Sequence, residues 1–327
     1  IFALPLLVLS ISGAIISYHD EIIDIFSKDE VVAGKKPLEI DEILKISKHI
    51  TFNSFAQWQK FKGIALQNGV ICGLRVNPEV SLAPTDSYNP CAKFSRLGIT
   101  RANFKPELLD GITGLHFHAL CEESASSLQV VLEAFEEKFG EFIPKMKWIN
   151  MGGGHHITRA DYDVELLIKI IRRFREKYGV EVYLEPGEAV GWQTGFLISS
   201  VLDIVHNEKD IAILDTSAEA HMPDTVLMPY RPAVRGESEN GKFAYRFGGN
   251  TCLAGDIVGL EAGDAEYKFD SELKINDRVI FEDQIHYTIV KNTTFNGIKL
   301  PDLLLLKENG EVKMIRELDY EEYRRRN

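Results

Sequence analysis

Short apolar runs alternate with longer segments of helical periodicity over the first 190 residues. Each run ends in polar residues or glycine, which is typical of a buried strand. The helical segments SSLQVVLEAFEEKFG (126–140) and YDVELLIKIIRRFREKYG (162–179) carry apolar residues three and four apart, and the second ends at Gly179, a residue favoured at helix C-termini. The runs predicted to be strands are GAIIS (13–17), EVVAG (30–34), HITFNS (49–54), ICGLRVNP (71–78), GLHFHAL (114–120), KWINMGGG (147–154) and EVYLEPGE (181–188).

Repeated strand–helix–strand units pair in parallel through right-handed crossovers. The pattern therefore predicts an α/β fold in which residues 1–190 form a (β/α)8 TIM-like barrel. A closed barrel of this kind has eight strands. The pattern supplies one strand fewer, so we expect the first strand to be missing and the barrel to be N-terminally incomplete.

The pattern changes after residue 190 to strand-like runs with turn signals and little helical periodicity. Residues 191–327 are therefore predicted to form a second, mostly β domain. A polar loop is expected at RGESENGK (235–242), a turn into a strand at KINDRVIF (274–281) and a charged tail at YEEYRRRN (320–327). The strand-like runs are GFLISSVLDIV (195–205), DIAILDTS (210–217), DRVIFEDQIHYTIV (277–290) and LPDLLLL (300–306).

The first stretch, IFALPLLVLSISGAII (1–16), resembles a signal peptide or a membrane segment at first sight. It has no basic region before it and no small-residue cleavage site, and Pro5 interrupts it. It is also shorter than the roughly 20 apolar residues that a membrane span requires. We expect a buried helix followed by a strand. Because the chain begins with Ile1, we also expect it to be a fragment.

Composition narrows the functional class. A formal net charge of −12 argues against a nucleic-acid-binding protein, which normally carries a basic face. The four cysteines, at 72, 91, 121 and 252, show no CxxC or other paired spacing. They are predicted to be reduced thiols, which indicates a cytoplasmic protein without a membrane partner.

The most informative segment is WINMGGGHHIT (148–158), followed by YLEPGEAVGWQTG (183–195). Gly152, Gly153 and Gly154 end one expected strand, and three residues without Cβ allow backbone N–H groups to approach a phosphate. Glu185 ends the next apolar run, directly before Pro186. A phosphate site beside a carboxylate indicates a phosphorylated cofactor with a basic nitrogen, a description that fits pyridoxal 5′-phosphate (PLP).

Several other residues are candidates for chemistry. His116 and His118 alternate along an expected strand, so both point to one face, either as buried hydrogen-bonded residues or with His118 against a cofactor ring. His155 and His156 are adjacent and lack the spacing of a metal site, so no metal is expected. The segment GGNTCLAGDIVG places Cys252 between glycines, either in an active-site loop or in a tight turn with a buried thiol.

Taken together, these motifs resemble those of the fold-type III PLP-dependent decarboxylases, which join a PLP-binding barrel to a β domain. The resemblance extends from about residue 40 to the C-terminus and is greatest to the carboxynorspermidine (carboxyspermidine) decarboxylase group. The motifs that carry it are SxxYNPCxxxSRLGI (87–99), GLHFHALCE (114–122), WINMGGGHHIT (148–158), YLEPGEAVGWQTG (183–195), DTSAEAHMPDTVLMPYRP (215–232), GNTCLAGD (249–256) and IHYTIVKNTTFNGIKLP (285–301).

The resemblance implies roles for the cofactor-binding residues. His118 would stack on the PLP ring, Gly153 and Gly154 would bind the phosphate with Tyr287 nearby, and Glu185 would pair with the pyridine nitrogen. The ring would then act as an electron sink for decarboxylation.

The resemblance also implies roles around the substrate. Cys252 would steer protonation after CO2 leaves, from a loop that crosses to the neighbouring subunit of a homodimer. Glu188 stands where several relatives have arginine, and with Asp224 it would bind the ammonium groups of a polyamine-type substrate. Leu253 occupies a position where an ornithine decarboxylase would be expected to have an acid. The implied reaction forms norspermidine or spermidine, in polyamine biosynthesis.

The lysine that binds PLP covalently in this family lies on the first barrel strand, and the chain begins at residues that resemble those just after it. Lys28, Lys35 and Lys36 stand in the wrong context to replace it. We expect truncation, and a polypeptide limited to this sequence is expected to be almost inactive.

Two alternatives stay open on the sequence. Diaminopimelate decarboxylase shares the implied fold and requires arginine for the distal end of its substrate, which Arg96 or Arg231 could supply. A non-catalytic PLP-binding protein of the alanine racemase barrel type is the other alternative, although such proteins lack a β domain.

Overall fold

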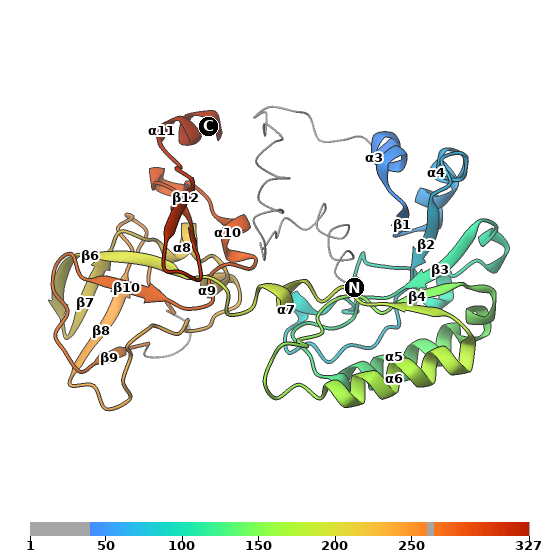
Figure 1. Ribbon diagram of the computed structural model, residues 1–327, viewed down its shortest axis with the longest axis horizontal. Coiled ribbons are helices and arrows are strands. Elements are labelled where there is room, and N and C mark those ends of the chain that lie inside the picture. Colours follow the sequence, from blue (N-terminus) through green and yellow to red (C-terminus); the bar gives the residue numbers. More distant parts are fainter. Residues whose placement is uncertain (1–39, 260–264, 327) are drawn as a thin grey trace. The chain divides into compact units, whose positions relative to one another are not determined.

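The computed structural model describes residues 40–259 and 265–326. The expected strands at 13–17 and 30–34 and the apolar stretch 1–16 lie outside the described residues. The described chain forms two compact units, one ending at Val190 and the other beginning at Gly191 (Figure 1). Each unit has a hydrophobic core of its own.

The first unit is built on a parallel sheet whose five strands follow one another in chain order. Each overlaps a run predicted from the sequence, so the presence of these five strands is confirmed. Because all five strands run in the same direction, their carboxyl ends meet at one edge of the sheet, where barrel enzymes place their active sites. The strands are β1 (His49–Phe52), β2 (Ile71–Arg75), β3 (Ile112–His116), β4 (Trp148–Asn150) and β5 (Glu181–Tyr183).

Two long helices of the first unit confirm the periodicity of the sequence. Helix α5 (Ala125–Phe139) begins at Ser124, whose hydroxyl accepts a hydrogen bond from the backbone N–H of Ser127. Helix α6 (Val164–Tyr178) ends at Gly179, which has the left-handed φ of 67° that glycine adopts without strain. The remaining helices are α3 (Ile40–Ile46), α4 (Phe55–Gln67) and α7 (Gly187–Gly191), with 3₁₀ turns at Asp86–Tyr88, Arg101–Asn103, Pro106–Leu108 and Gly140–Lys145.

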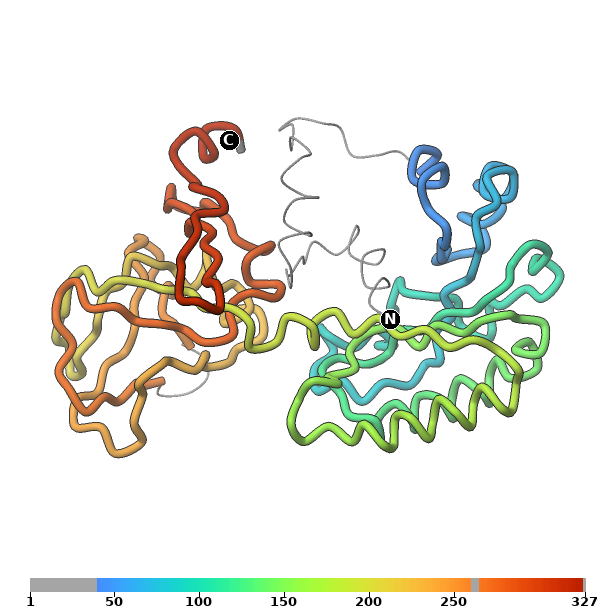
Figure 2. The backbone as a smooth tube through the Cα atoms, in the orientation of Figure 1, coloured from blue at the N-terminus to red at the C-terminus, as the bar shows by residue number. Residues whose placement is uncertain are grey.

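Helices α5 and α6 run side by side along the sheet (Figure 2). Glu136 of α5 joins them, because its carboxylate accepts hydrogen bonds from Arg173, Lys177 and Tyr178 of α6. The distances are 3.0, 2.7 and 2.9 Å. Burial alone would raise the pKa of Glu136, but these partners lower it, so the carboxylate is ionised and ties the two helices together.

Trp148 occupies space that two glycines leave free on neighbouring strands. A Cβ built on Gly114 of β3 would lie 2.1 Å from the indole, and one built on Gly73 of β2 would lie 2.3 Å from it. The indole Nε1 donates a hydrogen bond to the hydroxyl of Thr113 at 3.2 Å. Glycine at these two positions therefore makes room for one large aromatic side chain that extends across three strands.

The second unit is mostly β, as predicted. Its main sheet has the strand order β10-β6-β7-β8-β9, and its core includes the buried rings of Phe247, Tyr267 and Phe281. The predicted polar loop at 235–242 lies before β8. The strands are β6 (Leu197–Asn207), β7 (Lys209–Leu214), β8 (Phe243–Gly248), β9 (Tyr267–Phe269) and β10 (Arg278–Phe281), with a hairpin of β11 (Leu303–Leu306) and β12 (Val312–Arg316). Short helices are α8 (Ala218–His221), α9 (Asp224–Leu227), α10 (Thr288–Lys291) and α11 (Tyr320–Arg326), with a 3₁₀ turn at Phe295–Gly297.

Three local predictions are wrong. Strand β3 ends at His116, so His118 lies in the loop beyond it. The run 277–290 is not one strand, because β10 ends at Phe281 and positive φ values at Asp283 and Tyr287 turn the chain. Residues 320–326 form helix α11, because the Asp319 carboxylate accepts hydrogen bonds from the first N–H groups of that helix.

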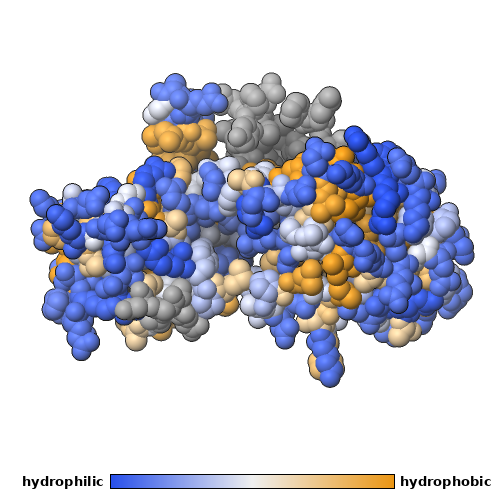
Figure 3. Space-filling model, turned by 90° about the horizontal axis from the view of Figure 1, so that it is seen from below, coloured by the Kyte–Doolittle hydropathy of each residue, from blue (hydrophilic) through white to orange (hydrophobic). Residues whose placement is uncertain are grey.

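The surface seen in Figure 3 is largely hydrophilic, in keeping with the net charge of −12. No helix within residues 40–259 and 265–326 is long and apolar enough to cross a membrane.

Candidate functional site

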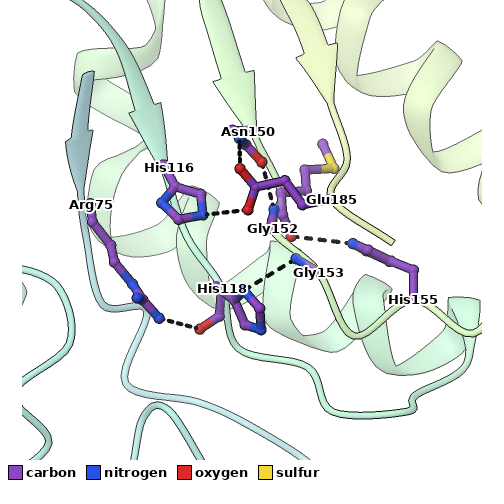
Figure 4. Close-up of polar contacts among 9 residues, drawn as sticks. Arg75, His116, His118, Asn150, Gly152, Gly153, His155 and Glu185 are labelled. Carbon is purple, nitrogen blue, oxygen red and sulfur yellow. Dashed lines mark hydrogen bonds and ion pairs between the residues drawn. The ribbon is translucent and has the colours of Figure 1, made fainter. Parts of the chain in front are cut away.

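Glu185 lies at the carboxyl edge of the parallel sheet, two residues beyond β5. Its Oε1 accepts a hydrogen bond from the side-chain amide of Asn150 at 2.7 Å, and its Oε2 lies 3.5 Å from Nε2 of His116 (Figure 4). Its backbone N–H donates to the carbonyl of Gly152 at 2.8 Å. The carboxylate is therefore held from the ends of β3 and β4 at once.

Burial by itself would raise the pKa of Glu185. The contact with His116 opposes this effect most strongly, and the amide of Asn150 and the electrostatic influence of His118 act in the same direction. The result is a pKa of about 2. The carboxylate is thus ionised at neutral pH in a largely buried place, which is the state required to pair with a protonated ring nitrogen.

The glycine loop lies beside this carboxylate. Gly152 and Gly154 have φ values of 71° and 79°, which other residues rarely adopt. A Cβ on Gly153 would lie 2.5 Å from the carbonyl oxygen of Glu185, and one on Gly154 would lie 2.2 Å from that of Leu120. These positions accept only glycine, because the loop packs directly against the segments that follow β3 and β5.

His118 lies in the same group of residues although it is not on a strand. Its Nδ1 accepts a hydrogen bond from the N–H of Gly153 at 3.3 Å. Burial, followed by the charge of Arg75, lowers the pKa of His118 to about 4. The ring is therefore neutral at physiological pH and offers an uncharged aromatic face, which suits stacking on another ring.

The two adjacent histidines after the loop have separate environments. His155 is buried and its Nε2 lies 3.2 Å from the carbonyl oxygen of Met151. His156 is also buried, and one ligand atom each of His156, Glu122 and Glu188 lie within 4.8 Å of one another. Glu188 is in the first turn of α7. The predicted substrate residue Glu188 thus belongs to a carboxylate–imidazole cluster that the sequence pattern did not reveal.

His116, His118 and Glu185 also have ligand atoms within 4.8 Å of one another. A metal could use that spacing, but the chemistry of the surroundings fits PLP better. The neighbouring loop has no room for a side chain at three successive positions, and without side chains its backbone can approach a phosphate closely. The residues present therefore fit PLP at both its phosphate and its ring nitrogen.

The other predicted site residues lie in the second unit. Cys252 is exposed, and all four cysteines have free thiols. Its loop is anchored by buried Asp256, whose carboxylate accepts hydrogen bonds from Ser217, Ala218 and Thr251 at 3.0, 2.7 and 2.6 Å. Asp256 is therefore a structural residue that fixes the loop from which the Cys252 thiol projects.

Asp224 and Tyr287 meet at one lysine. The carboxylate of Asp224 accepts a hydrogen bond from Lys291 at 2.5 Å, and the same ammonium group lies 5.4 Å from the centre of the Tyr287 ring. Tyr287 is 41% exposed and stands at the start of α10 with a φ of 51°. Asp224 thus already binds one ammonium group, which shows that its surroundings accept a cation.

The site also contains residues that the sequence analysis did not single out. Asn150 contacts both Glu185 and Gly152, and Arg75 at the end of β2 donates to the backbone carbonyl of His118 at 3.4 Å. The position of Asn150 was visible in the sequence, two residues before Gly152 at the end of an expected strand, but its contact with Glu185 was not.

Parallel strands, a glycine loop and an ionised carboxylate at their carboxyl edge define a PLP-binding enzyme of the barrel type. A model of the family described as "Pyridoxal-dependent decarboxylase, C-terminal sheet domain" matches residues 12–284. The chain belongs to this family of PLP-dependent decarboxylases, whose fold joins a barrel to a C-terminal sheet domain. The family predicted from the sequence is therefore confirmed, together with its cofactor and fold class.

Characterised relatives include a carboxynorspermidine/carboxyspermidine decarboxylase from Campylobacter jejuni, 56% identical over 88% of this chain and 77% of that protein. A carboxyaminopropylagmatine decarboxylase from Synechocystis is 44% identical over 89% of this chain and 75% of that protein. The crystal structure of Campylobacter jejuni carboxynorspermidine decarboxylase in complex with norspermidine superposes with a TM-score of 0.81, at 53% identity, covering 90% of this chain and 79% of that one.

Proposed function

We propose that this protein removes CO2 from carboxynorspermidine or carboxyspermidine and forms norspermidine or spermidine. The observation that carries the proposal is the ionised Glu185 beside a glycine loop, in a chain 56% identical to a decarboxylase of these two triamines. The norspermidine complex of a related enzyme supports the same substrate class.

PLP, when bound, supplies a ring that withdraws the electrons left on the substrate carbon as CO2 departs. Gly153 and Gly154 would bind its phosphate, with Tyr287 as a further phosphate residue. Glu185 would hold the proton on the pyridine nitrogen. His118, neutral at physiological pH, would present its flat face to the ring without competing for that proton.

Two acids are proposed to recognise the substrate amines. Glu188 lies with Glu122 and His156 in a group where two carboxylates outnumber the single imidazole. Asp224 holds Lys291, and an incoming substrate ammonium group would replace that lysine at the carboxylate. Charge-assisted hydrogen bonds of this kind are stronger than neutral ones and favour a polycationic substrate.

Cys252 is proposed to steer protonation of the substrate carbon. Its thiol is exposed on a loop that Asp256 fixes, so it is accessible to a reactant. We propose that it acts in the active site of the neighbouring subunit of a homodimer. The free thiols also support our proposal that the protein works in the cytoplasm.

Product analysis with purified full-length protein tests the proposed reaction. Carboxynorspermidine, carboxyspermidine, carboxyaminopropylagmatine and meso-diaminopimelate are supplied separately, and CO2 and the amine product are quantified. We expect kcat/KM to be at least roughly a hundredfold higher for a carboxylated triamine than for diaminopimelate, because unpaired buried charges penalise the wrong substrate strongly. A higher kcat/KM for diaminopimelate or carboxyaminopropylagmatine than for either carboxylated triamine would refute the proposal.

Alanine variants test the substrate residues. Glu188→Ala and Asp224→Ala should each raise KM about tenfold or more, since each removes a charged partner of an ammonium group. Glu107→Ala, which removes an exposed acid from a 3₁₀ turn, serves as the control and should leave KM unchanged. An unchanged KM in the Glu188 or Asp224 variant would remove that residue from the substrate site.

A further inference from the structure

Asn150, the last residue of β4, connects the two parts of the cofactor site. Its Oδ1 accepts a hydrogen bond from the N–H of Gly152 at 2.8 Å, and its Nδ2 donates to Oε1 of Glu185 at 2.7 Å (Figure 4). The first bond fixes the orientation of the side-chain amide, because of its two polar atoms only the oxygen can accept a hydrogen bond from an N–H. The NH2 group is therefore directed at the carboxylate.

The main chain reinforces this arrangement. The N–H of Glu185 donates to the carbonyl of Gly152 at 2.8 Å, so Gly152 is linked to Glu185 directly and again through Asn150. A Cβ on Gly152 would lie 2.4 Å from the carbonyl oxygen of Phe117, so the loop is also confined from the side of β3. Glycine loop, amide and carboxylate consequently form one closed set of hydrogen bonds.

We propose that Asn150 is a positioning residue that aims the Glu185 carboxylate at the ring nitrogen of PLP and couples its position to the phosphate loop. The inference rests on the role proposed above for Glu185. This role requires an uncharged hydrogen-bond donor at residue 150. The donor must bond to one oxygen of Glu185 while the carboxylate keeps its negative charge.

The charges around Glu185 explain why a neutral donor is suited to this position. His116 lies 3.5 Å from Oε2, which is an electrostatic contact rather than a strong hydrogen bond. His118, His155 and Arg75 also act on the carboxylate electrostatically. Asn150 supplies the closest of the side-chain contacts, and it does so with an uncharged donor.

Asn150→Leu tests the inference, because leucine has a side chain of similar shape to asparagine but no polar atoms. PLP labelled with ¹⁵N at the pyridine nitrogen reports the protonation of the ring in the holoenzyme by NMR. We expect the pyridine nitrogen to lose its proton at a pH lower by about one unit than in the parent, since its carboxylate partner is no longer aimed at it. We also expect kcat to fall roughly tenfold with a much smaller change in KM.

Asn150→Asp keeps the shape and the acceptor for Gly152 and replaces the donor with a second carboxylate 2.7 Å from Glu185. Two carboxylates in contact share a proton at low pH and repel each other at high pH. The ratio of the PLP dissociation constant of this variant to that of the parent should therefore rise about tenfold between roughly pH 6 and 8. A ratio that is flat with pH would overturn the inference, even if Asn150→Leu failed to fold.

Asn77→Leu is the matched control. Asn77 is buried, and its Oδ1 accepts a hydrogen bond from the N–H two residues later, that of Glu79, as Oδ1 of Asn150 does from Gly152. Its Nδ2, however, donates to the backbone carbonyl of Leu97 rather than to a carboxylate. This variant should lose stability without changing protonation of the pyridine nitrogen. A change as large as that in Asn150→Leu would show that the effect is merely structural.

Glu185→Gln separates the inference from the function on which it depends. If the pyridine nitrogen stays protonated in this variant, the proposed role of Glu185 fails and the inference fails with it. If the nitrogen loses its proton in Glu185→Gln but both Asn150 variants behave like the parent, only the role of Asn150 is refuted.

Discussion

Replacing Gly153 with alanine tests how tightly the glycine loop is packed. The added Cβ would lie 2.5 Å from the carbonyl oxygen of Glu185 and 3.1 Å from Cε1 of His118. Even a very tight contact of about 3.0 Å requires the loop and Glu185 to separate by roughly 0.5 Å. The hydrogen bond of 2.8 Å between Glu185 N–H and the Gly152 carbonyl opposes that separation. Overpacking of this kind costs about 1–3 kcal/mol.

The same displacement moves the Glu185 carboxylate within the site. Shifts approaching 1 Å reduce catalysis by up to about a hundredfold, so we expect PLP affinity and kcat to fall roughly tenfold or more. Urea unfolding measures the stability and spectroscopic titration measures the affinity for PLP. Gly63→Ala is the control, because Gly63 lies in helix α4 with no atom near its added Cβ, and it should gain roughly 0.5–1 kcal/mol. A Gly153→Ala protein with parental stability and affinity would refute the reasoning.

Three further predictions concern stability. Gly114→Ala should destabilise the first unit by about 1–3 kcal/mol or more, measured by urea unfolding, because its Cβ would overlap the Trp148 ring. Asp256→Ala should cost roughly 2–4 kcal/mol in the same assay, because two buried donors and the partly buried hydroxyl of Thr251 lose their acceptor; a loss below about 0.5 kcal/mol would contradict this account. Burial lowers the pKa of His118 and His221 to about 4, so the unfolded chain binds protons that the folded chain does not. Their stabilising effect is complete above a pH of about 6.5 and is lost as the pH falls towards 4, and His221→Asn should make this loss less steep in urea unfolding at several pH values.

The elements with a clear repeat were predictable from the sequence. The strands from residue 49 to 183 and helices α5 and α6 are found where apolar periodicity places them, because each buries one face in its own core. The family was predictable as well, since its motifs are dense.

Features set by local backbone geometry were not predictable in this way. His118 lies beyond β3, although alternation with His116 suggested one continuous strand, because the strand ends at His116 and the segment that follows packs against the glycine loop. Tyr287 turns the chain through a positive φ, which an apolar pattern does not encode.

The polar contacts of the site were also hidden from the sequence. Asn150 and Glu185 are 35 positions apart, and their hydrogen bond depends on the parallel register that pairs β4 with β5. The cluster of Glu122, His156 and Glu188 likewise joins three separate segments. Periodicity indicates which side of an element is buried, but not which distant side chains meet there.

Trp148 gives the parallel sheet a natural fluorophore. Its indole spans the strands on either side of Gly114, and only one residue, Ile149, separates Trp148 from Asn150, the hydrogen-bond partner of Glu185 at the end of β4. Indole emission depends on packing and on the polarity of its surroundings, so disturbance of this strand alters the colour and intensity of the emitted light. The strand that leads into the glycine loop therefore contains an intrinsic fluorescent probe, and its packing can be monitored without an added label.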